Sequence, residues 1–273
     1  LLDNKKPDGM DFYFLSYMSE GKIYVGTSGW DYKHWRGVFY PRGITIAGEL
    51  TYYSGLFNAS EINNSFYRLP LPSTVKRWVA EVPAGFCFCP KMSRYITHAK
   101  KLNAPQQGLP RFFEVFDPFR RRLGPILIQL PSMLGFNREK ASIFFEALKM
   151  YKGYRFALEP RHSSWMEEDA IRLLKKYHIG FVIAESGKRW PSGEFITASH
   201  IYLRFHGPNG YYDTAYPGQR LAAIAKKCRD WASEGHTIWA FFNNDGHAYA
   251  VKNAMTFKRL LAKSPADADR WYS

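Results

Sequence analysis

Cysteine is scarce in this chain, whose 273 residues include three, at positions 87, 89 and 228. Three thiols cannot build a disulfide framework, and the sequence has neither a Cys-x-x-Cys pair nor a His-Glu-x-x-His run. The usual zinc motifs are therefore missing. We interpret Cys87, Cys89 and Cys228 as packing residues of a protein from a reducing cytoplasm.

Long hydrophobic runs are missing as well, since no stretch approaches the roughly 20 apolar residues that a membrane span needs. The apolar stretch at residues 12–18 is short for a signal peptide, and no convincing cleavage site follows it. We therefore predict a cytoplasmic protein with no membrane partner. Residues 1–20 are interpreted as an extension ahead of one domain, residues 21–273.

Acidic residues are few relative to basic ones, with 24 Asp and Glu against 38 Lys and Arg and a formal net charge of +14. A basic balance of this size favours an anionic partner, either a small molecule or a nucleic acid. The alternative is a basic surface that keeps the protein soluble, because the positive charges are scattered along the chain. Hydrophobic residues make up 46% and aromatic residues 17%, which excludes wholesale disorder.

Short β-rich runs recur along the chain, separated by helical patterns. The eight runs lie at residues 22–26, 60–65, 86–91, 126–130, 154–159, 179–184, 201–205 and 237–242. Pro72 and Asn137 mark two helix starts, Ser164 and Glu167 have capping-box spacing, and Pro118 is expected to break a helix. The connection at residues 186–199 has no helical pattern.

Eight such units, without a linker or an internal repeat, predict a single α/β domain: a (β/α)₈ barrel of the TIM type with an irregular sixth βα connection. An open doubly wound sheet is the alternative. The segment Gly26-Thr27-Ser28-Gly29 follows the first run, but it does not complete the Gly-x-Gly-x-x-Gly fingerprint of dinucleotide sites. A nucleotide-cofactor version of the open sheet therefore loses its main support.

Polar residues share one side of the predicted strands, because side chains alternate between the interior of a barrel and its helix-facing side. The inner parity includes Glu61, Asn63, Cys89, Lys91, Gln129, Glu159, Arg161, Tyr202, Arg204 and His206, and Glu185 ends the sixth run in step with Ile183. Carboxylates and cations inside a barrel must pair or serve a ligand. We interpret the set as a site at the carboxyl ends of the strands. An internal salt-bridge network, such as Glu159 with Arg161 or Arg204, is the alternative.

Two loops are suited to anions. Residues 206–210 follow the seventh run, and Asn243, Asn244 and Asp245 lead from the eighth run into a helix whose N-terminal amides would face the site. This is the common phosphate position in TIM barrels, with ordinary turns and a helix cap as the alternative. Aromatic residues of the predicted upper loops would stack on bases or sugars, or else plug the barrel mouth. They are Trp30, Tyr32, His34, Trp35, Tyr67, Trp165, Trp190, Tyr211, Tyr212 and Tyr216.

Several motifs occur in a characteristic order. They are residues 25–30, Phe39-Tyr40-Pro41, residues 61–70, Ile96-Thr97-His98, residues 124–131, residues 161–165, Arg204-Phe205-His206-Gly207 and residues 242–245. Together they resemble the DUF72 (YecE-like) family over residues 22–262. The resemblance implies a TIM-type barrel of unassigned biochemical function and carries over no established catalytic residues. Two departures are Glu159-Pro160-Arg161, where the family tends to have Glu-Phe-Arg, and Glu185, where an Asp is usual.

We predict an enzyme that acts on a phosphate-bearing substrate, with nucleic acid as one candidate, at the carboxyl-terminal face of the barrel. The candidate catalytic residues are Glu61, Glu159, Glu185 and His206. The candidate substrate-binding residues are Asn63, Tyr67, Lys91, His98, Arg161, His162, Arg204, Gly207, Asn243, Asn244 and Asp245. A divalent cation such as Mg²⁺ is compatible with the carboxylates.

Three functions remain open at this point. Metal-assisted phosphodiester hydrolysis, as in the endonuclease IV barrels, would need a denser array of His and carboxylate ligands than the sequence offers. Isomerase or lyase chemistry on a sugar phosphate would use a carboxylate with a lysine or a histidine and needs no metal. A barrel that only binds RNA or DNA through a basic, aromatic-rich surface would lose affinity steeply with ionic strength.

Overall fold

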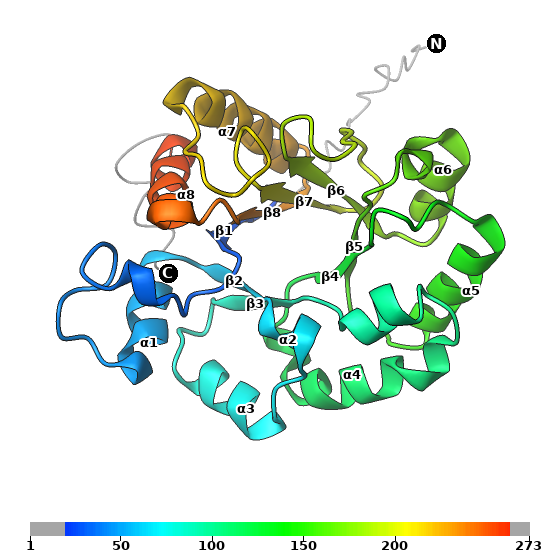
Figure 1. Ribbon diagram of the computed structural model, residues 1–273, viewed down its shortest axis with the longest axis horizontal. Helices are drawn as coiled ribbons and strands as arrows, with labels where there is room; N and C mark the ends of the chain where they lie inside the picture. The colour runs from blue at the N-terminus through cyan, green and yellow to red at the C-terminus, as the bar shows by residue number, and fades with distance from the viewer. Residues whose placement is uncertain (1–19, 263–273) are drawn as a thin grey trace, which may run out of the picture.

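Eight strands alternate with helices along residues 20–262, the part of the chain that the computed structural model describes (Figure 1). The strands are β1 (Ile23–Thr27), β2 (Ala59–Ile62), β3 (Cys87–Pro90), β4 (Ile126–Gln129), β5 (Phe156–Glu159), β6 (Gly180–Glu185), β7 (His200–Phe205) and β8 (Thr237–Phe242). The α-helices are α1 (Ile46–Leu56), α2 (Asn64–Tyr67), α3 (Pro72–Ala80), α4 (Leu109–Phe116), α5 (Arg138–Lys149), α6 (Glu168–Lys176), α7 (Gly218–Ser233) and α8 (Tyr249–Leu261). Each predicted β-rich run overlaps a strand, although the run predicted at residues 60–65 continues past the end of β2 into α2. The predicted N-terminal extension lies outside the described residues up to residue 19, as do residues 263–273.

Local sequence signals explain where several helices begin and end. Pro72 occupies the first turn of α3, where a missing N–H is tolerated, and Asn137 Oδ1 accepts a hydrogen bond from Lys140 N at the start of α5. A 3₁₀ turn that carries Pro118 follows α4, as predicted. The capping box predicted at Ser164 is wrong, because this residue lies in a separate 3₁₀ turn and α6 begins without a side-chain cap. Within residues 20–262, no helix combines the length and apolar composition that a membrane span requires.

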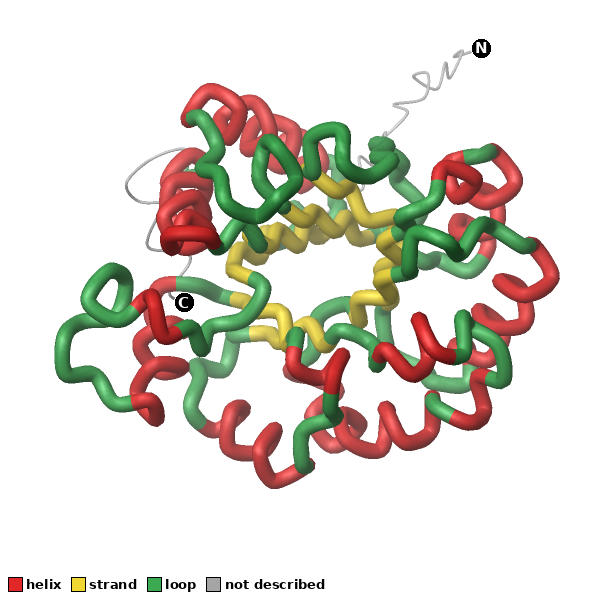
Figure 2. Tube along the Cα trace, viewed as in Figure 1, coloured by secondary structure: helices red, strands yellow, loops and turns green. Residues whose placement is uncertain are grey.

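The strands form two parallel sheets. One is a curled six-stranded sheet in the order β1-β8-β7-β6-β5-β4, and the other is the pair β2-β3. Figure 2 shows the strands arranged around a common centre, with the helices outside them. Because β1 pairs with β8 and the order follows the chain without a reversal, the alternative of an open doubly wound sheet is wrong.

The two sheets meet through local contacts instead of a continuous ladder. On one side, two isolated bridges join the β3 segment to the β4 segment, one between Phe88 and Leu123 and one between Lys91 and Leu127. On the other side, the Asn58 side chain accepts a hydrogen bond from Val25 N and donates one to Ile23 O, both on β1. The structure therefore has the predicted α/β class with a curled six-stranded sheet, and β2 and β3 form ladder pairs only with each other.

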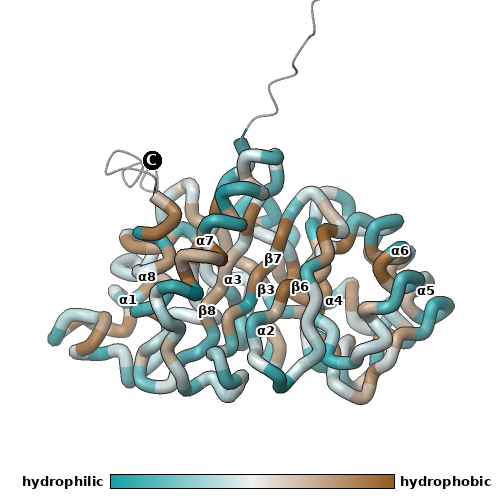
Figure 3. Tube along the Cα trace, turned by 90° about the horizontal axis from the view of Figure 1, so that it is seen from above, coloured by the Kyte–Doolittle hydropathy of each residue, from teal (hydrophilic) through white to brown (hydrophobic). Residues whose placement is uncertain are grey.

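Hydrophobic cores lie on both sides of the strands. Outward side chains pack under the helices, and a smaller inner cluster consists of Ala59, Cys89, Leu127, Ala157, Val182, Tyr202, Trp239 and Phe241. Figure 3 shows the segments labelled β6 and β7 largely in the brown of hydrophobic residues. Cys89 and Cys228 are buried and Cys87 is half-buried, in agreement with packing roles. On β2, β3, β4, β5 and β7 the inner cluster has the parity predicted for the polar side chains, which continue it toward the carboxyl ends, whereas on β6 the inward residue is Val182 and the parity predicted through Glu185 is wrong.

The connection from β6 to β7, residues 186–199, contains neither a helix nor a strand, as the sequence predicts. Two of its residues hold it in place, Thr197 against β6 and Arg189 against the loop after β7. Thr197 Oγ1 accepts a hydrogen bond from Phe181 N and donates one to Ile179 O, and Arg189 Nη1 donates to Gly210 O in the loop after β7. The connection is therefore hydrogen-bonded to its surroundings near its start, at Arg189, and near its end, at Thr197.

Candidate functional site

An ion-pair network lies between the two sheets at the carboxyl ends of the strands. Arg204 of β7 donates from Nε and Nη2 to the two oxygens of Glu61 on β2, at 2.8 and 2.9 Å. Its Nη1 donates to Glu159 Oε2 on β5, at 2.7 Å. The three side chains are at most 2% exposed. Because β2 and β7 belong to different sheets, Arg204 ties the sheets together.

Glu61 accepts two further hydrogen bonds. Ser28 Oγ donates to Oε2 at 2.5 Å, and the Tyr202 hydroxyl donates to Oε1 at 2.8 Å. Each carboxylate oxygen of Glu61 thus has one neutral donor and one guanidinium donor. Such a carboxylate is a poor general base, because protonation would break bonds to a buried cation.

Glu159 is surrounded by donors in the same way. Arg161 Nη2 and His206 Nε2 both donate to its Oε1, at 2.9 and 2.8 Å. Asn243 Nδ2 lies 3.3 Å from His206 Nδ1 and donates to it, so the proton of a neutral His206 ring sits on Nε2. Burial by itself would raise the pKa of Glu159, but Arg161, Arg204 and His206 hold it well below its ordinary value. Burial lowers the pKa of His206 to about 4, which keeps the imidazole neutral at pH 7.

Lys91 lies at the end of β3, next to this network. Its Nζ donates to Gln129 Oε1 at 2.7 Å and lies 4.2 Å from the centre of the Phe66 ring. Burial, with the charge of Arg204 as the second cause, lowers the pKa of Lys91 to about 7. An amine that is neutral in a large fraction of molecules near pH 7 can exchange a proton with a bound ligand.

The carboxylates of the network do not suit a divalent metal. Both oxygens of Glu61 and both oxygens of Glu159 already accept hydrogen bonds, and an arginine takes part at each carboxylate. Across residues 20–262, no group of three or more His, Cys, Asp or Glu side chains is arranged to hold a metal ion. Hard cations need oxygen ligands that are free to coordinate. The donor set therefore does not fit the Mg²⁺ ion that the sequence permits.

Three predicted substrate-binding residues lie around the same end of the strands. Asn63 donates from Nδ2 to a backbone carbonyl of the loop after β1, while its buried Oδ1 has no partner. His98 packs edge-on against Phe66, with 5.0 Å between ring centres, and burial lowers its pKa. His98 and Lys91 therefore share the Phe66 ring. Tyr67 is 72% exposed.

Two predicted site residues point away from the network. Glu185 pairs with Arg220 of α7 because Val182 takes the inward parity of β6, which turns the odd-numbered positions toward the helices. His162 is exposed and accepts a hydrogen bond from the Ser164 backbone N–H, where it caps a 3₁₀ turn. The expectation that Glu185 and His162 join the other polar residues is corrected accordingly.

The loops after β7 and β8 are bound to their surroundings by the predicted residues. Asn244 is buried, and its Nδ2 donates to Asn253 Oδ1 of α8 at 2.8 Å. Asp245 Oδ1 accepts a hydrogen bond from Trp35 Nε1 at 2.7 Å. Gly207 has a φ of +91°, a conformation that favours glycine. Asn244, Asp245 and Gly207 therefore hold the two loops in shape. From the loop after β8, Asn243 contacts the ion-pair network through His206.

Three residues outside the predicted set complete the site. They are Ser28 and Tyr202, which donate to Glu61, and Gln129, which accepts from Lys91. Tyr202 and Gln129 have the inner parity, so the strand pattern contained the signal that would have included them. Ser28 follows β1 in the glycine-containing segment, where no alternation marks the direction of a side chain.

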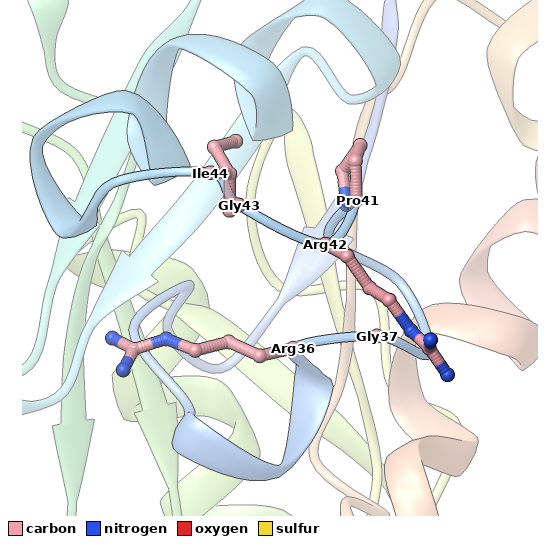
Figure 4. Close-up of a pocket in the computed structure, with 6 residues that line it drawn as sticks. All are labelled: Arg36, Gly37, Pro41, Arg42, Gly43 and Ile44. Atoms are coloured by element: carbon pink, nitrogen blue, oxygen red, sulfur yellow. The ribbon is translucent and has the colours of Figure 1, made fainter.

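The pocket in Figure 4 lies apart from the network. It has a volume of about 410 Å³ and is lined by Arg36, Gly37, Pro41, Arg42, Gly43 and Ile44. The side chains of Arg36 and Arg42 extend in different directions in the picture, and Arg36 Nε is bound to Glu49 at 2.7 Å. The two cations therefore do not converge on one ligand position.

A curled parallel α/β sheet with a buried ion-pair network at its carboxyl end defines the structural class of this protein. A family model described as "Protein of unknown function DUF72" matches residues 24–271. The chain belongs to this family, and the resemblance predicted from the motifs is confirmed.

Individual relatives agree with this assignment. The chain is 29% identical over 169 residues to UPF0759 protein YecE of Escherichia coli K12, a match that covers 60% of this chain and 59% of YecE. It is 26% identical over 271 residues to UPF0759 protein YunF of Bacillus subtilis, covering 88% of this chain and 94% of YunF. The crystal structure of a DUF72 family protein from Thermotoga maritima superposes with a TM-score of 0.80 at 28% identity, covering 88% of this chain and 99% of that one.

Proposed function

We propose that this protein is an enzyme of the isomerase or lyase type, which acts on a small phosphate-bearing carbonyl compound with Lys91 as the group that moves a proton. The observation that carries the proposal is the environment of the amine. Lys91 Nζ is held between Gln129 Oε1 and the Phe66 ring at the carboxyl ends of the strands, and its pKa is about 7. A general base is most effective when its pKa is close to the working pH.

The neighbouring charges support an anionic substrate. The positive charges of Arg204 and Arg161 are neutralised by Glu61 and Glu159, with which they form ion pairs. The Lys91 amine donates to the neutral Gln129 side chain and forms no ion pair with either carboxylate. Arg161 is close enough to lower the pKa of Lys91. An anion that binds here would relieve this repulsion and raise the pKa of the amine.

The same ion pairs favour chemistry without a metal. Metal-assisted phosphodiester hydrolysis needs carboxylates that are free to coordinate, whereas those of Glu61 and Glu159 are occupied by guanidinium groups. Proton transfer next to a carbonyl needs an amine or an imidazole and donors that stabilise the developing oxyanion. Lys91 supplies the amine, held by Gln129 at the carboxyl ends of the strands. The partner we propose is thus a small anionic molecule and not a nucleic acid.

We also propose that the two sheets act as one closed (β/α)₈ barrel, whose carboxyl-terminal face is the usual place of an active site. The bridge from Lys91 to Leu127 supports closure on one side, and the Asn58 side chain supports it on the other. Arg204 supports it across the interior. The catalytic residues of barrel enzymes come from the ends of several strands, as Lys91 and Arg161 do here.

Deuterium exchange tests the proposed reaction. The protein would be incubated in D₂O with dihydroxyacetone phosphate and with pentulose phosphates, and NMR would follow exchange of the C–H bond next to the carbonyl. We expect exchange in a phosphorylated substrate that is slower by about 100-fold or more in Lys91→Met, the usual effect of losing a general base. The unphosphorylated compounds should exchange at the background rate.

Lys149→Met is the matched control, because Lys149 Nζ also lies over an aromatic ring, that of Tyr177, but is 61% exposed on the outer surface. This variant should exchange at the wild-type rate. Exchange that survives Lys91→Met, or no exchange in any of these phosphorylated compounds, would contradict the proposal.

A further inference from the structure

Trp190, on the connection from β6 to β7, packs on Arg161 at the end of β5. The guanidinium carbon of Arg161 lies 4.5 Å from the centre of the Trp190 ring. The neighbouring Arg189 holds the connection in place, since its Nη1 donates to Gly210 O at 2.9 Å and its guanidinium carbon lies 4.9 Å from the centre of the Tyr211 ring. Trp190 therefore has a defined position over a cation of the ion-pair network.

Two hydrogen-bond donors of this stacked pair have no acceptor. Arg161 Nε and Trp190 Nε1 are both buried, and neither has a hydrogen-bond partner. The side chain of Arg161 is only 4% exposed, so water has little access to it. Ser186 Oγ, at the start of the same connection, is also buried and unpaired. Buried polar groups are nearly always paired in native proteins, and three exceptions on adjoining segments point to a ligand.

The chemistry of these groups defines that ligand. The N–H groups of arginine and tryptophan can only donate, so the ligand must present acceptor oxygens. The positive charge of Arg161 favours an anion. Each N–H bond lies in the plane of its own group, the guanidinium or the indole, so a ligand with several oxygens that reaches the edges of both groups can accept from both. The bond from Arg161 Nη2 to Glu159 fixes the orientation of the guanidinium.

We propose that Trp190 and Arg161 form an oxyanion-binding subsite, with Ser186 as an additional donor, and that it holds the phosphoryl group of the substrate. The inference rests on the proposed function and deepens it. It assigns recognition of the phosphoryl group to the sixth connection and leaves the Lys91 amine for the carbonyl end of the substrate. It also gives the irregular β6–β7 connection a role that an ordinary helical connection would not provide.

Titration calorimetry with inorganic phosphate at low ionic strength tests the subsite on the whole chain. Trp190→Phe keeps an aromatic face over Arg161 and removes the indole N–H. We expect its affinity for phosphate to fall about tenfold or more, the usual effect of losing one hydrogen bond to a charged group. Trp239→Phe is the matched control, because Trp239 Nε1 is likewise buried and unpaired, but its ring lies against Arg155, which precedes β5 at the opposite end of the strands. That variant should bind phosphate like the wild type, and equal affinities of Trp190→Phe and wild type would overturn the subsite.

A second measurement uses the wild-type chain and so does not depend on the folding of a variant. The chain has eight tryptophans, each with one indole N–H signal in a ¹⁵N-labelled sample. Phosphate should move the assigned Trp190 signal downfield and leave that of Trp239 in place. An unmoved Trp190 signal at a saturating phosphate concentration would overturn the subsite.

The two proposals fail separately. Phosphate binding that depends on Trp190, together with no deuterium exchange in any carbonyl compound, would contradict the proposed reaction and support the subsite. Deuterium exchange that requires Lys91, together with phosphate binding that is unchanged in Trp190→Phe, would support the reaction and overturn the subsite.

Discussion

Arg204 binds Glu61 through two nitrogens, Nε and Nη2, across the boundary between the six-stranded sheet and the β2-β3 pair. Both side chains are buried, so each has lost its water shell. Desolvation of two charges is costly, and such a pair is not by itself evidence of net stabilisation. Removal of one partner is different, because it leaves the other charge buried and unpaired.

Arg204→Met is therefore expected to lower the free energy of unfolding by about 3–5 kcal/mol, because Glu61 and Glu159 lose their shared counterion. Glu185→Gln is the control. The pair that Glu185 forms with Arg220 is partly exposed and should contribute about 1 kcal/mol or less. Urea denaturation followed by circular dichroism measures both. Similar losses in the two variants would show that the network does not hold the sheets together.

Gly26→Ala should destabilise the protein at the contact between β1 and β2. An added Cβ would lie 1.9 Å from the Ala59 carbonyl oxygen, and backbone atoms cannot move aside as a flexible side chain can. We expect a loss of about 3 kcal/mol or more, the upper end of overpacking effects. Gly218→Ala, where nothing lies within 4 Å of the added Cβ, should leave the melting temperature unchanged or raise it. A Gly26→Ala protein as stable as the wild type would mean that β1 and β2 are farther apart.

Lys91 should make the folded state more stable as the pH rises from about 7 to about 10. The pKa of the amine is about 7 in the folded chain, against an ordinary value of 10.5. In this interval the unfolded chain holds a proton that the folded chain lacks, so raising the pH favours folding. Below pH 7 both states are protonated, and the full cost of burying the charge is present. The free energy of unfolding of wild type minus that of Lys91→Met should therefore increase with pH, whereas a constant difference would mean that the amine titrates normally.

His206 should be neutral at pH 7, with its proton on Nε2. Its pKa is about 4, below the ordinary value of 6.5, so acidification through this interval protonates the unfolded chain first and destabilises the folded one. Imidazole ¹⁵N shifts would identify the tautomer. Asn243→Leu removes the donor to Nδ1 and should leave this tautomer in place, because the Glu159 carboxylate still requires the proton on Nε2. A charged ring, or a proton on Nδ1 in the wild type at pH 7, is the result that would contradict this assignment.

The inner face of most strands could be predicted because polar residues mark it. Glu61 and Arg204 alternate with large apolar residues, and this alternation is a local property of the chain. The sixth strand lacks such a mark, since Val182 and Ile183 are both apolar and either could face inward. The prediction for Glu185 followed the wrong parity for this reason. His162 was misplaced because it follows the end of a strand, where alternation no longer constrains the direction of a side chain.

The amino-acid sequence by itself determined the approximate positions of the strands, the starts of some helices, the family and most of the charged residues at one end of the fold. Only the tertiary structure decided which charges neutralise each other and which keep donors available. Arg204 and Glu61 are 143 residues apart in the chain, and their contact depends on how two separate sheets approach each other. Short-range patterns describe the direction of a side chain relative to its own strand. The distance to a charge on another strand is set by packing of the whole domain, which no local pattern contains.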